Sequence, residues 1–181
     1  MYPFLRMATT MLAAKFEPSL PPEGRDVSHH RAMPWDLDLF GEVNNGRILS
    51  LYDLGRFHYS VRVGLVGVLR REGWALTIAG SSIRYRHRLH AFQRYDIHTR
   101  CIGRDARFFY ISQSMWRGET ALSHGLYRTA VVQKGGIVET DRVAEAMGAP
   151  GWNPSLPEYA KAWIEAEAER PWPPENHTQP E

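Results

Sequence analysis

Two acids and a pair of asparagines precede a run of apolar residues at helical spacing. Asp38 lies three residues before Gly41, and Asn44 and Asn45 follow directly ahead of the periodic run. The first turn of a helix has backbone N–H groups without intrahelical partners and carries the positive end of the helix dipole. Thioester hydrolysis needs a group that activates water, or a carboxylate nucleophile, together with donors for the developing oxyanion. An aspartate just before a helix can reach a carbonyl carbon while the helix amides hold its oxygen, so this stretch is a candidate active site.

The same residue types also serve purely structural purposes. Asparagine is a favoured N-cap, so Asn45 is as consistent with helix capping as with a role in a site. We favour a catalytic role for Asp38, with a loop or capping acid as the alternative. Asp36 is expected to be structural, and Glu42 is expected to face solvent. The sequence contains no G-x-S-x-G motif, so a serine-hydrolase mechanism has no support.

Two further groups of residues could contact a substrate. Tyr52, Gly55 and Tyr59 recur at helical spacing, and they line either the core, which we favour, or an acyl pocket. Five arginines are interleaved with tyrosine and histidine, namely Arg84, Arg86, Arg88, Arg94 and Arg100. Such a cluster could bind the phosphates of coenzyme A or RNA, with a solvated sheet face as the default interpretation.

The remaining residues with chemical potential are expected to be structural. His58 is expected on a helix face, outside any catalytic triad, and Cys101 is expected in the core on an alternating strand. His29 and His30 are not expected to bind a metal ion, because no second pair of ligands has matching spacing.

One long helix must position the candidate site. It is expected to begin near Asn44 or Asn45 and to end near Arg62, a length of about 27 Å at 1.5 Å per residue. A strand is expected before it, from Val27 to Trp35, and a short second helix after it, from Leu65 to Arg71.

Four strands are expected to follow the helices. Apolar and polar residues alternate over 74–89, 92–103, 106–116 and 118–136. The connections between these segments are short, so each strand is expected to be the antiparallel neighbour of the next. A long, largely apolar helix must bury its stripe against such a sheet. The sequence therefore predicts an α+β fold, with a curved antiparallel sheet wrapped around a central helix.

The two ends of the chain read as extensions. The expected parts are an N-terminal extension and linker over 1–26, the domain over 27–148, and a helix (Leu156–Glu169) with a loose tail over 149–181. The N-terminus is apolar but contains Arg6, and it is shorter than the ~20 residues of a membrane span. We expect it to pack on the domain as a helix or strand. Contact at a membrane surface, and then a processed targeting segment, are the less favoured alternatives. Thr140 is expected to cap a short helix that Gly148 closes.

Composition limits the class of protein. The 181 residues, with 43% hydrophobic and 23% charged, fit one globular domain. A net charge of +2 gives no general case for nucleic-acid binding. The single cysteine excludes an intramolecular disulfide, so a reducing compartment such as the cytoplasm is expected.

The motif at the candidate site resembles a known signature. Asp38, Gly41, Val43 and the Asn44–Asn45 pair follow the pattern D-x-x-G-H-V-N-N-x-x-Y of hotdog-fold acyl-CoA thioesterases, the 4-hydroxybenzoyl-CoA thioesterase superfamily. The strand segments I83-R-Y and F92-Q-R-Y-D-I-H-T-R are similar to a strand pair of the same family. The resemblance extends over roughly residues 27–148.

The resemblance implies a fold, a reaction and an assembly. It implies a hotdog domain in which Asp38 is the base or nucleophile and the backbone amides of Val43–Asn45 form the oxyanion site. Asn44 or Asn45 would orient water or the acyl carbonyl. The substrate would be an acyl-CoA or acyl-carrier thioester, with coenzyme A as part of the substrate and no other cofactor. The assembly would be a homodimer or homotetramer, with sheets joined edge to edge and the pocket at the subunit interface.

Two departures from the family pattern motivate an alternative. Glu42 replaces the family's histidine, and Gln93–Arg94 replaces a Gly-Asp turn. Glu42 places a second carboxylate near Asp38. The alternative is a hotdog protein that binds acyl-CoA or lipid without hydrolysing it. A hotdog dehydratase is not favoured, because its usual His–Asp pairing has no evident counterpart in the sequence.

Overall fold

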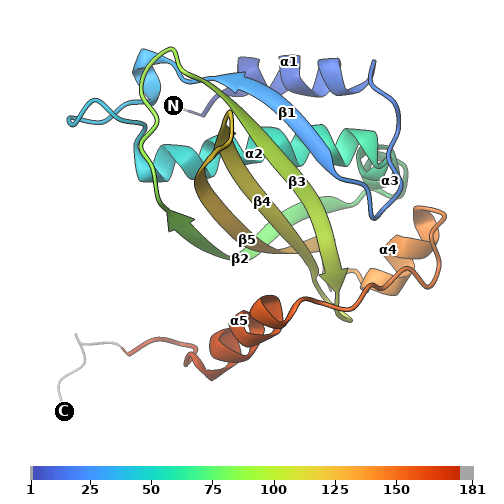
Figure 1. Ribbon diagram of the computed structural model, residues 1–181. Helices are drawn as coiled ribbons and strands as arrows, with labels where there is room; N and C mark the ends of the chain where they lie inside the picture. Colours follow the sequence, from blue (N-terminus) through green and yellow to red (C-terminus); the bar gives the residue numbers. More distant parts are fainter. Residues whose placement is uncertain (1, 176–181) are drawn as a thin grey trace.

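The computed structural model describes residues 2–175 and shows a curved antiparallel sheet wrapped around one long helix (Figure 1). The central helix is α2 (Asn45–Arg62), and the sheet has the strand order β1-β3-β4-β5-β2, with β6 paired to β5. The strands are β1 (Asp26–Arg31), β2 (Ala75–Tyr85), β3 (Arg94–Arg104), β4 (Phe109–Arg117), β5 (Thr120–Gln133) and β6 (Gly136–Ile137). This arrangement confirms the predicted α+β architecture.

The central helix begins and packs for identifiable reasons. The Asn44 side chain accepts hydrogen bonds from the amides of Gly46 and Arg47, at 2.9 and 3.2 Å, so the N-cap is Asn44 rather than Asn45. In the middle of the helix, a Cβ on Gly55 would lie 2.5 Å from the Cγ2 of Ile97. The absence of a side chain at Gly55 therefore lets the helix approach the sheet closely, and this contact fixes the distance between the two layers.

The order of the strands corrects one expectation. β3, β4 and β5 are antiparallel neighbours as predicted, but β2 pairs with β5 at the far edge and not with β3. The connection from β2 to β3, residues 86–93, crosses from the β2 edge of the sheet to the strand next to the other edge strand, β1. The crossing passes the N-terminal end of α2, where the Val43 amide donates to the Leu89 carbonyl at 2.7 Å. A helix can be enclosed only if the sheet curls, and this connection carries the chain from the β2 edge to β3.

The first strand is shorter than expected. The strand predicted from Val27 to Trp35 ends at Arg31, and a 3₁₀ turn (Pro34–Asp36) follows. Pro34 lacks a backbone N–H and favours the start of a helical turn, which accounts for the early end of the strand.

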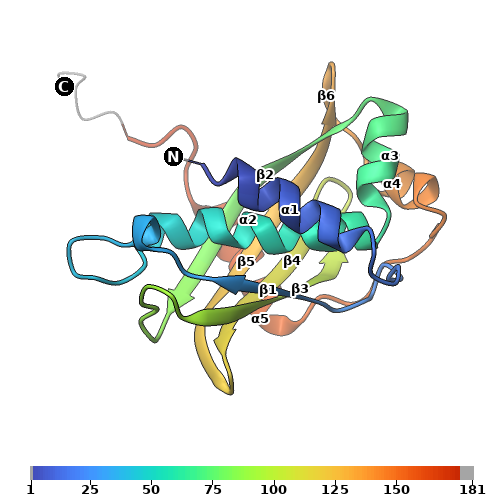
Figure 2. The same ribbon diagram turned by 90° about the horizontal axis from the view of Figure 1, so that it is seen from above.

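The N-terminal segment forms a helix on the domain, as expected. α1 (Phe4–Ala14) runs alongside α2 in Figure 2. Arg6 of α1 forms an ion pair with Asp36, at 2.7 Å, and Tyr2 donates to Asp53, at 3.1 Å. Within residues 2–175, no helix is long and apolar enough to span a bilayer.

Three short helices complete the domain, namely α3 (Leu65–Glu72), α4 (Thr140–Ala146) and α5 (Glu158–Glu169). Thr140 is the first residue of α4 and not its cap; its hydroxyl donates to the Asp105 carbonyl and accepts from Arg104. Gly148 follows α4 with a φ of 73°, as a helix-ending glycine does. α5 packs through Ala160 on the sheet face turned away from α2. The predicted loose tail lies partly beyond the described residues.

Candidate active site

The loop before α2 is a tight, hairpin-like turn. Leu37 and Val43 form an antiparallel bridge, and the Asp38 amide donates to the Glu42 carbonyl at 2.9 Å. Gly41 closes the turn with a φ of 74°, a conformation that side-chain-bearing residues rarely adopt. The turn therefore places Asp38 across from the residues that lead into the helix.

The Asp38 carboxylate is half-buried and only partly used. Its Oδ1 accepts the Phe40 amide at 2.9 Å, in the manner of an Asx turn. Within residues 2–175, its other oxygen has no hydrogen-bond partner. One carboxylate oxygen is thus fixed by the loop while the other is available to a substrate or to water.

The three backbone amides expected to form an oxyanion site differ in availability. The Val43 amide donates to Leu89, and the Asn44 amide donates to the Asp36 carbonyl at 3.1 Å. The amide of Asn45, the first residue of α2, has no acceptor in the described part of the chain. Asn45 is also exposed. The free donor at the positive end of the helix dipole is therefore that of Asn45.

Asp36 is a buried structural acid, in line with its expected role. Its carboxylate binds the Arg47 Nε at 2.6 Å, the Arg6 Nη1 at 2.7 Å and the Met33 amide at 3.0 Å. Burial alone would raise the pKa of Asp36, but the bonds from Arg47, the Met33 amide and Arg6 together hold that pKa below its usual value. This charge cluster ties α1, the 3₁₀ turn and the first turn of α2 together beside Asp38.

Two side chains from the 86–93 connection hold the loop from outside. Arg88, expected to contact substrate, forms an ion pair with Glu42 at 2.8 Å. His90 contacts the Gly41 carbonyl through Nδ1 at 2.9 Å. Glu42 is half-buried and paired rather than solvent-facing. No local motif identifies His90 as a contact of the loop, because only the crossing connection brings it there.

The three helix residues expected to line either the core or an acyl pocket are all buried in the core, and Tyr59 also borders a cavity. Tyr52 is fully buried, with its hydroxyl 2.8 Å from that of Ser123, and Gly55 is packed against the sheet. Tyr59 borders a narrow apolar cavity of about 60 Å³ between the C-terminal half of α2, the sheet and α4, and Cys101 lines the same cavity. Burial raises the pKa of the Cys101 thiol to about 12, so it stays protonated.

The expected arginine cluster is dispersed over the sheet. Arg84 lies on β2, Arg86 and Arg88 lie in the crossing connection, and Arg94 and Arg100 lie on β3. Because β2 and β3 are at different places in the sheet, residues near in sequence do not form one patch. Of the five arginines, Arg84 and Arg100 lie on the sheet face turned away from α2, where they line two adjoining hollows.

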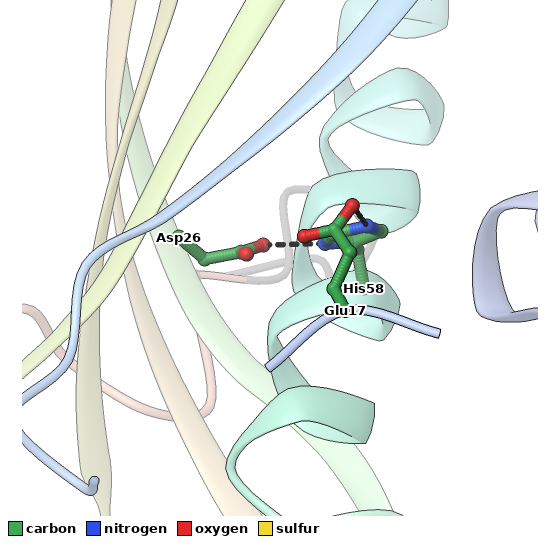
Figure 3. A group of neighbouring side chains, drawn as sticks. All are labelled: Glu17, Asp26 and His58. Atoms are coloured by element: carbon green, nitrogen blue, oxygen red, sulfur yellow. Dashed lines mark hydrogen bonds and ion pairs between the residues drawn. The ribbon is translucent and has the colours of Figure 1, made fainter. Parts of the chain in front are cut away.

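A charge cluster at the opposite end of α2, formed by the buried Asp26 and His58 with the exposed Glu17, was not expected (Figure 3). His58 is buried, contacting Asp26 through Nδ1 at 2.8 Å and Glu17 through Nε2 at 3.3 Å. A His–Asp pair therefore exists, which corrects the expectation that the sequence has none and that His58 only occupies a helix face. Strand pairing and the linker bring the three residues together from distant positions, so no local motif signals them.

The contacts of this cluster are those of a structural ion-pair network. The carboxylate and imidazole atoms lie within 4.8 Å of one another, which is close enough for a metal ion. The Arg62 guanidinium already lies 2.6 Å from Asp26 and 3.0 Å from Glu17 and supplies the positive charge. Both imidazole nitrogens contact carboxylates, so His58 is not free to act on a substrate. The cluster fixes the linker and β1 to the C-terminal end of α2.

The sequence of this chain matches a known protein family. The family model described as the thioesterase-like superfamily matches residues 33–158, which include the loop, α2 and the strands of the sheet after it. The chain is 28% identical to Protein THEM6 of Xenopus laevis over 165 residues, covering 89% of this chain and 78% of that protein.

Solved structures share the fold at low sequence identity. The probable thioesterase YbaW of Escherichia coli superposes with a TM-score of 0.62 at 13% identity, covering 67% of this chain and 95% of that chain. The DHNA-CoA thioesterase of Staphylococcus aureus superposes with a TM-score of 0.60 at 11% identity, covering 80% of this chain and 91% of that chain. These superpositions confirm the hotdog fold implied by the sequence resemblance.

Proposed function

Since this chain belongs to the thioesterase-like superfamily, we propose that it hydrolyses an acyl thioester to a carboxylic acid and a free thiol. The substrate is an acyl-CoA or an acyl-carrier thioester. One observation carries the proposal: Asp38 lies in the turn that the Leu37–Val43 bridge closes, Asn45 follows two residues after it, and among residues 2–175 one carboxylate oxygen of Asp38 and the Asn45 amide have no hydrogen-bond partner.

The proposed reaction uses these two groups in complementary roles. Asp38 accepts a proton from water as the water attacks the thioester carbonyl carbon; direct attack by the carboxylate is the alternative route. The carbonyl oxygen becomes an oxyanion and accepts a hydrogen bond from the Asn45 amide at the positive end of α2. The tetrahedral intermediate then expels the thiolate, which takes up a proton. The reaction consumes only water, and coenzyme A enters as part of the substrate.

The surroundings of the loop support an assembly in which a partner subunit completes the pocket. Leu39 and Phe40 project from the tip of the loop and are almost fully exposed, although both are large and apolar. β2 is an edge strand whose outer side has no partner within residues 2–175. A long strand with a free edge is a template for pairing with another strand. We therefore propose a homodimer, alone or within a homotetramer, joined along β2.

The test separates the backbone donor from its side chain. Thiol release from short, long and aromatic acyl-CoAs is measured for the wild type, Asp38→Asn, Asn45→Pro and Asn45→Ala. Proline suits the first helical position and removes only the amide N–H there. Losing the base or the oxyanion donor should each cost ~10²-fold or more in kcat. Asn45→Ala keeps the amide and should retain most activity. A proline variant as active as the alanine variant would remove Asn45 from the mechanism.

A second function is favoured by one specific observation. The apolar cavity beside Tyr59 lies at the C-terminal half of α2, beyond the tight contact at Gly55. This separation from Asp38 suits a protein that binds an acyl chain without cleaving it. Binding of acyl-CoA with no thiol release from any of the three substrate classes would support binding alone. A loss of turnover in Asp38→Asn with unchanged folding would exclude binding without hydrolysis.

A cytoplasmic location stays a prediction from the single cysteine.

A further inference from the structure

A polar groove runs along the sheet face turned away from α2. Thr99 and Gln113 lie where α2 meets the sheet, next to Gly55. Because successive side chains on a strand point to opposite faces, their neighbours Arg100 and Ser112 project to the other side. We call this side the outer groove, formed by β2–β5 and by Tyr159 and Trp163 of α5.

The outer groove has room for a small ligand. Two hollows of about 410 and 480 Å³ meet at His124 and Tyr159, which line both. Volumes of this size are typical of sites for small molecules and cofactors. The hollow on one side contains Arg25 and Arg100, and the hollow on the other contains Arg84.

No carboxylate among residues 2–175 neutralises the three arginines of the outer groove. Arg25, Arg84 and Arg100 form no ion pair with any carboxylate in residues 2–175. Arg84 lies opposite His124 in the β2–β5 pairing, and Arg100 lies opposite Ser112, whose hydroxyl is 3.0 Å from the His124 Nε2. Burial, and then the charges of Arg84 and Arg100, lower the pKa of His124. Cations therefore flank His124 from both sides.

The acids near the outer groove do not offset this charge. Asp26 alone is acidic among the described lining residues, and its carboxylate is turned toward His58 and Arg62 of α2. The net charge facing the groove is positive. Guanidinium groups bind phosphate oxygens through paired hydrogen bonds, so the matching ligand is a phosphorylated anion.

Aromatic side chains add a second recognition element. The Tyr159 side chain is 47% exposed and meets the His124 ring edge-on, at 6.4 Å between centroids. Trp116 is stacked on His98 at 5.7 Å in the other hollow, and its Nε1 donates to Ser114 at 2.7 Å. Aromatic rings beside cations are typical of surfaces that stack nucleobases while holding phosphate.

We propose that the outer groove binds a nucleoside diphosphate, with the base against Tyr159 and the phosphates at Arg84 and Arg100. The sheet separates this site from Asp38, so the proposal does not rest on thioester hydrolysis. A nucleoside diphosphate occurs both as a free nucleotide and as part of coenzyme A, so either could supply the ligand.

Calorimetric titration of the full chain tests the site. ADP, pyrophosphate, adenosine and coenzyme A are titrated into the wild type, Arg84→Ala, Arg100→Ala and Arg70→Ala. Arg70 is an exposed arginine on α3 with no ion pair among the described residues, so its variant is a charge-matched control. ADP is expected to bind more tightly than pyrophosphate or adenosine, and each groove variant should weaken ADP at least ~10-fold. The control should leave ADP affinity unchanged.

The remaining outcomes are each decisive. Equal affinity for pyrophosphate and ADP, or equal loss in all three variants, would overturn a nucleotide site. Tighter binding of a single-stranded oligonucleotide than of ADP would overturn a small ligand. If ADP binds more tightly than coenzyme A, the natural ligand is a free nucleotide. If coenzyme A binds more tightly than ADP and loses affinity in the groove variants, the natural ligand is coenzyme A. Because Arg84 is exposed and Arg100 is half-buried with no ion pair among residues 2–175, both variants are expected to fold.

Discussion

Two aspartates two residues apart should have opposite roles, and paired substitutions separate them. Asp36→Asn removes the charge that Arg6 and Arg47 neutralise, whereas Asp38→Asn changes a half-buried loop carboxylate. Removing one partner of a buried ion pair typically costs 3–5 kcal/mol, because the remaining charge is left without compensation. The two arginine side chains keep 22% and 14% of their exposure, so water relieves part of this cost. We therefore expect Asp36→Asn to lower the free energy of unfolding by about 3 kcal/mol.

The assay is urea unfolding followed by tryptophan fluorescence, alongside thiol release. Asp36→Asn should lower the midpoint without changing the slope, equivalent to about 6–12 °C in Tm for a chain of this size. Asp38→Asn should change stability by less than ~1 kcal/mol, as expected for a site with one loop hydrogen bond. It should instead lose turnover. An Asp36→Asn protein as stable as the wild type, or an Asp38→Asn protein with full activity, would refute the reasoning.

Acid should weaken the same cluster in a defined range. The pKa of Asp36 is held below its ordinary value near 3.8, so the folded state binds a proton less readily than the unfolded state. The stability from Asp36 is therefore complete above that ordinary value and is lost as the pH falls through the lower, folded-state pKa. In Asp36→Asn this part of the acid transition should disappear.

Three further variants test the fold around the site. Asn44→Ala removes the N-cap of α2 and should cost about 1 kcal/mol in urea unfolding, whereas an unchanged midpoint would contradict the capping role. Gly55→Ala gains about 1 kcal/mol of helix propensity but crowds Ile97, so we expect a net loss of about 1–2 kcal/mol by the same method; a stabilised variant would show that α2 can shift from the sheet. Burial, with the nearby Arg6 charge, lowers the pKa of His30 to about 3, so wild-type stability should fall as the pH drops from 6.5 toward 3. His30→Gln should flatten stability over that range, and an unaltered pH profile would exclude His30 as its source.

Local chemistry was readable from the sequence because it depends on neighbours along the chain. The helix start at Asn44–Asn45 and the alternation of the strands follow from capping and burial. The same local pattern carried the family resemblance, which the match over residues 33–158 confirms. The proposed catalytic role of Asp38 also comes from this local motif.

Tertiary structure decided everything that depends on distant residues meeting. The sheet must curl to enclose α2, so β2 pairs with β5 and the 86–93 connection crosses to bring Leu89 and His90 to the loop. That crossing occupies the Val43 amide, whereas the Asn45 amide has no acceptor among residues 2–175. The Asp26–His58 pair likewise arises from separate elements, because a buried charge finds its partner in space and not along the chain.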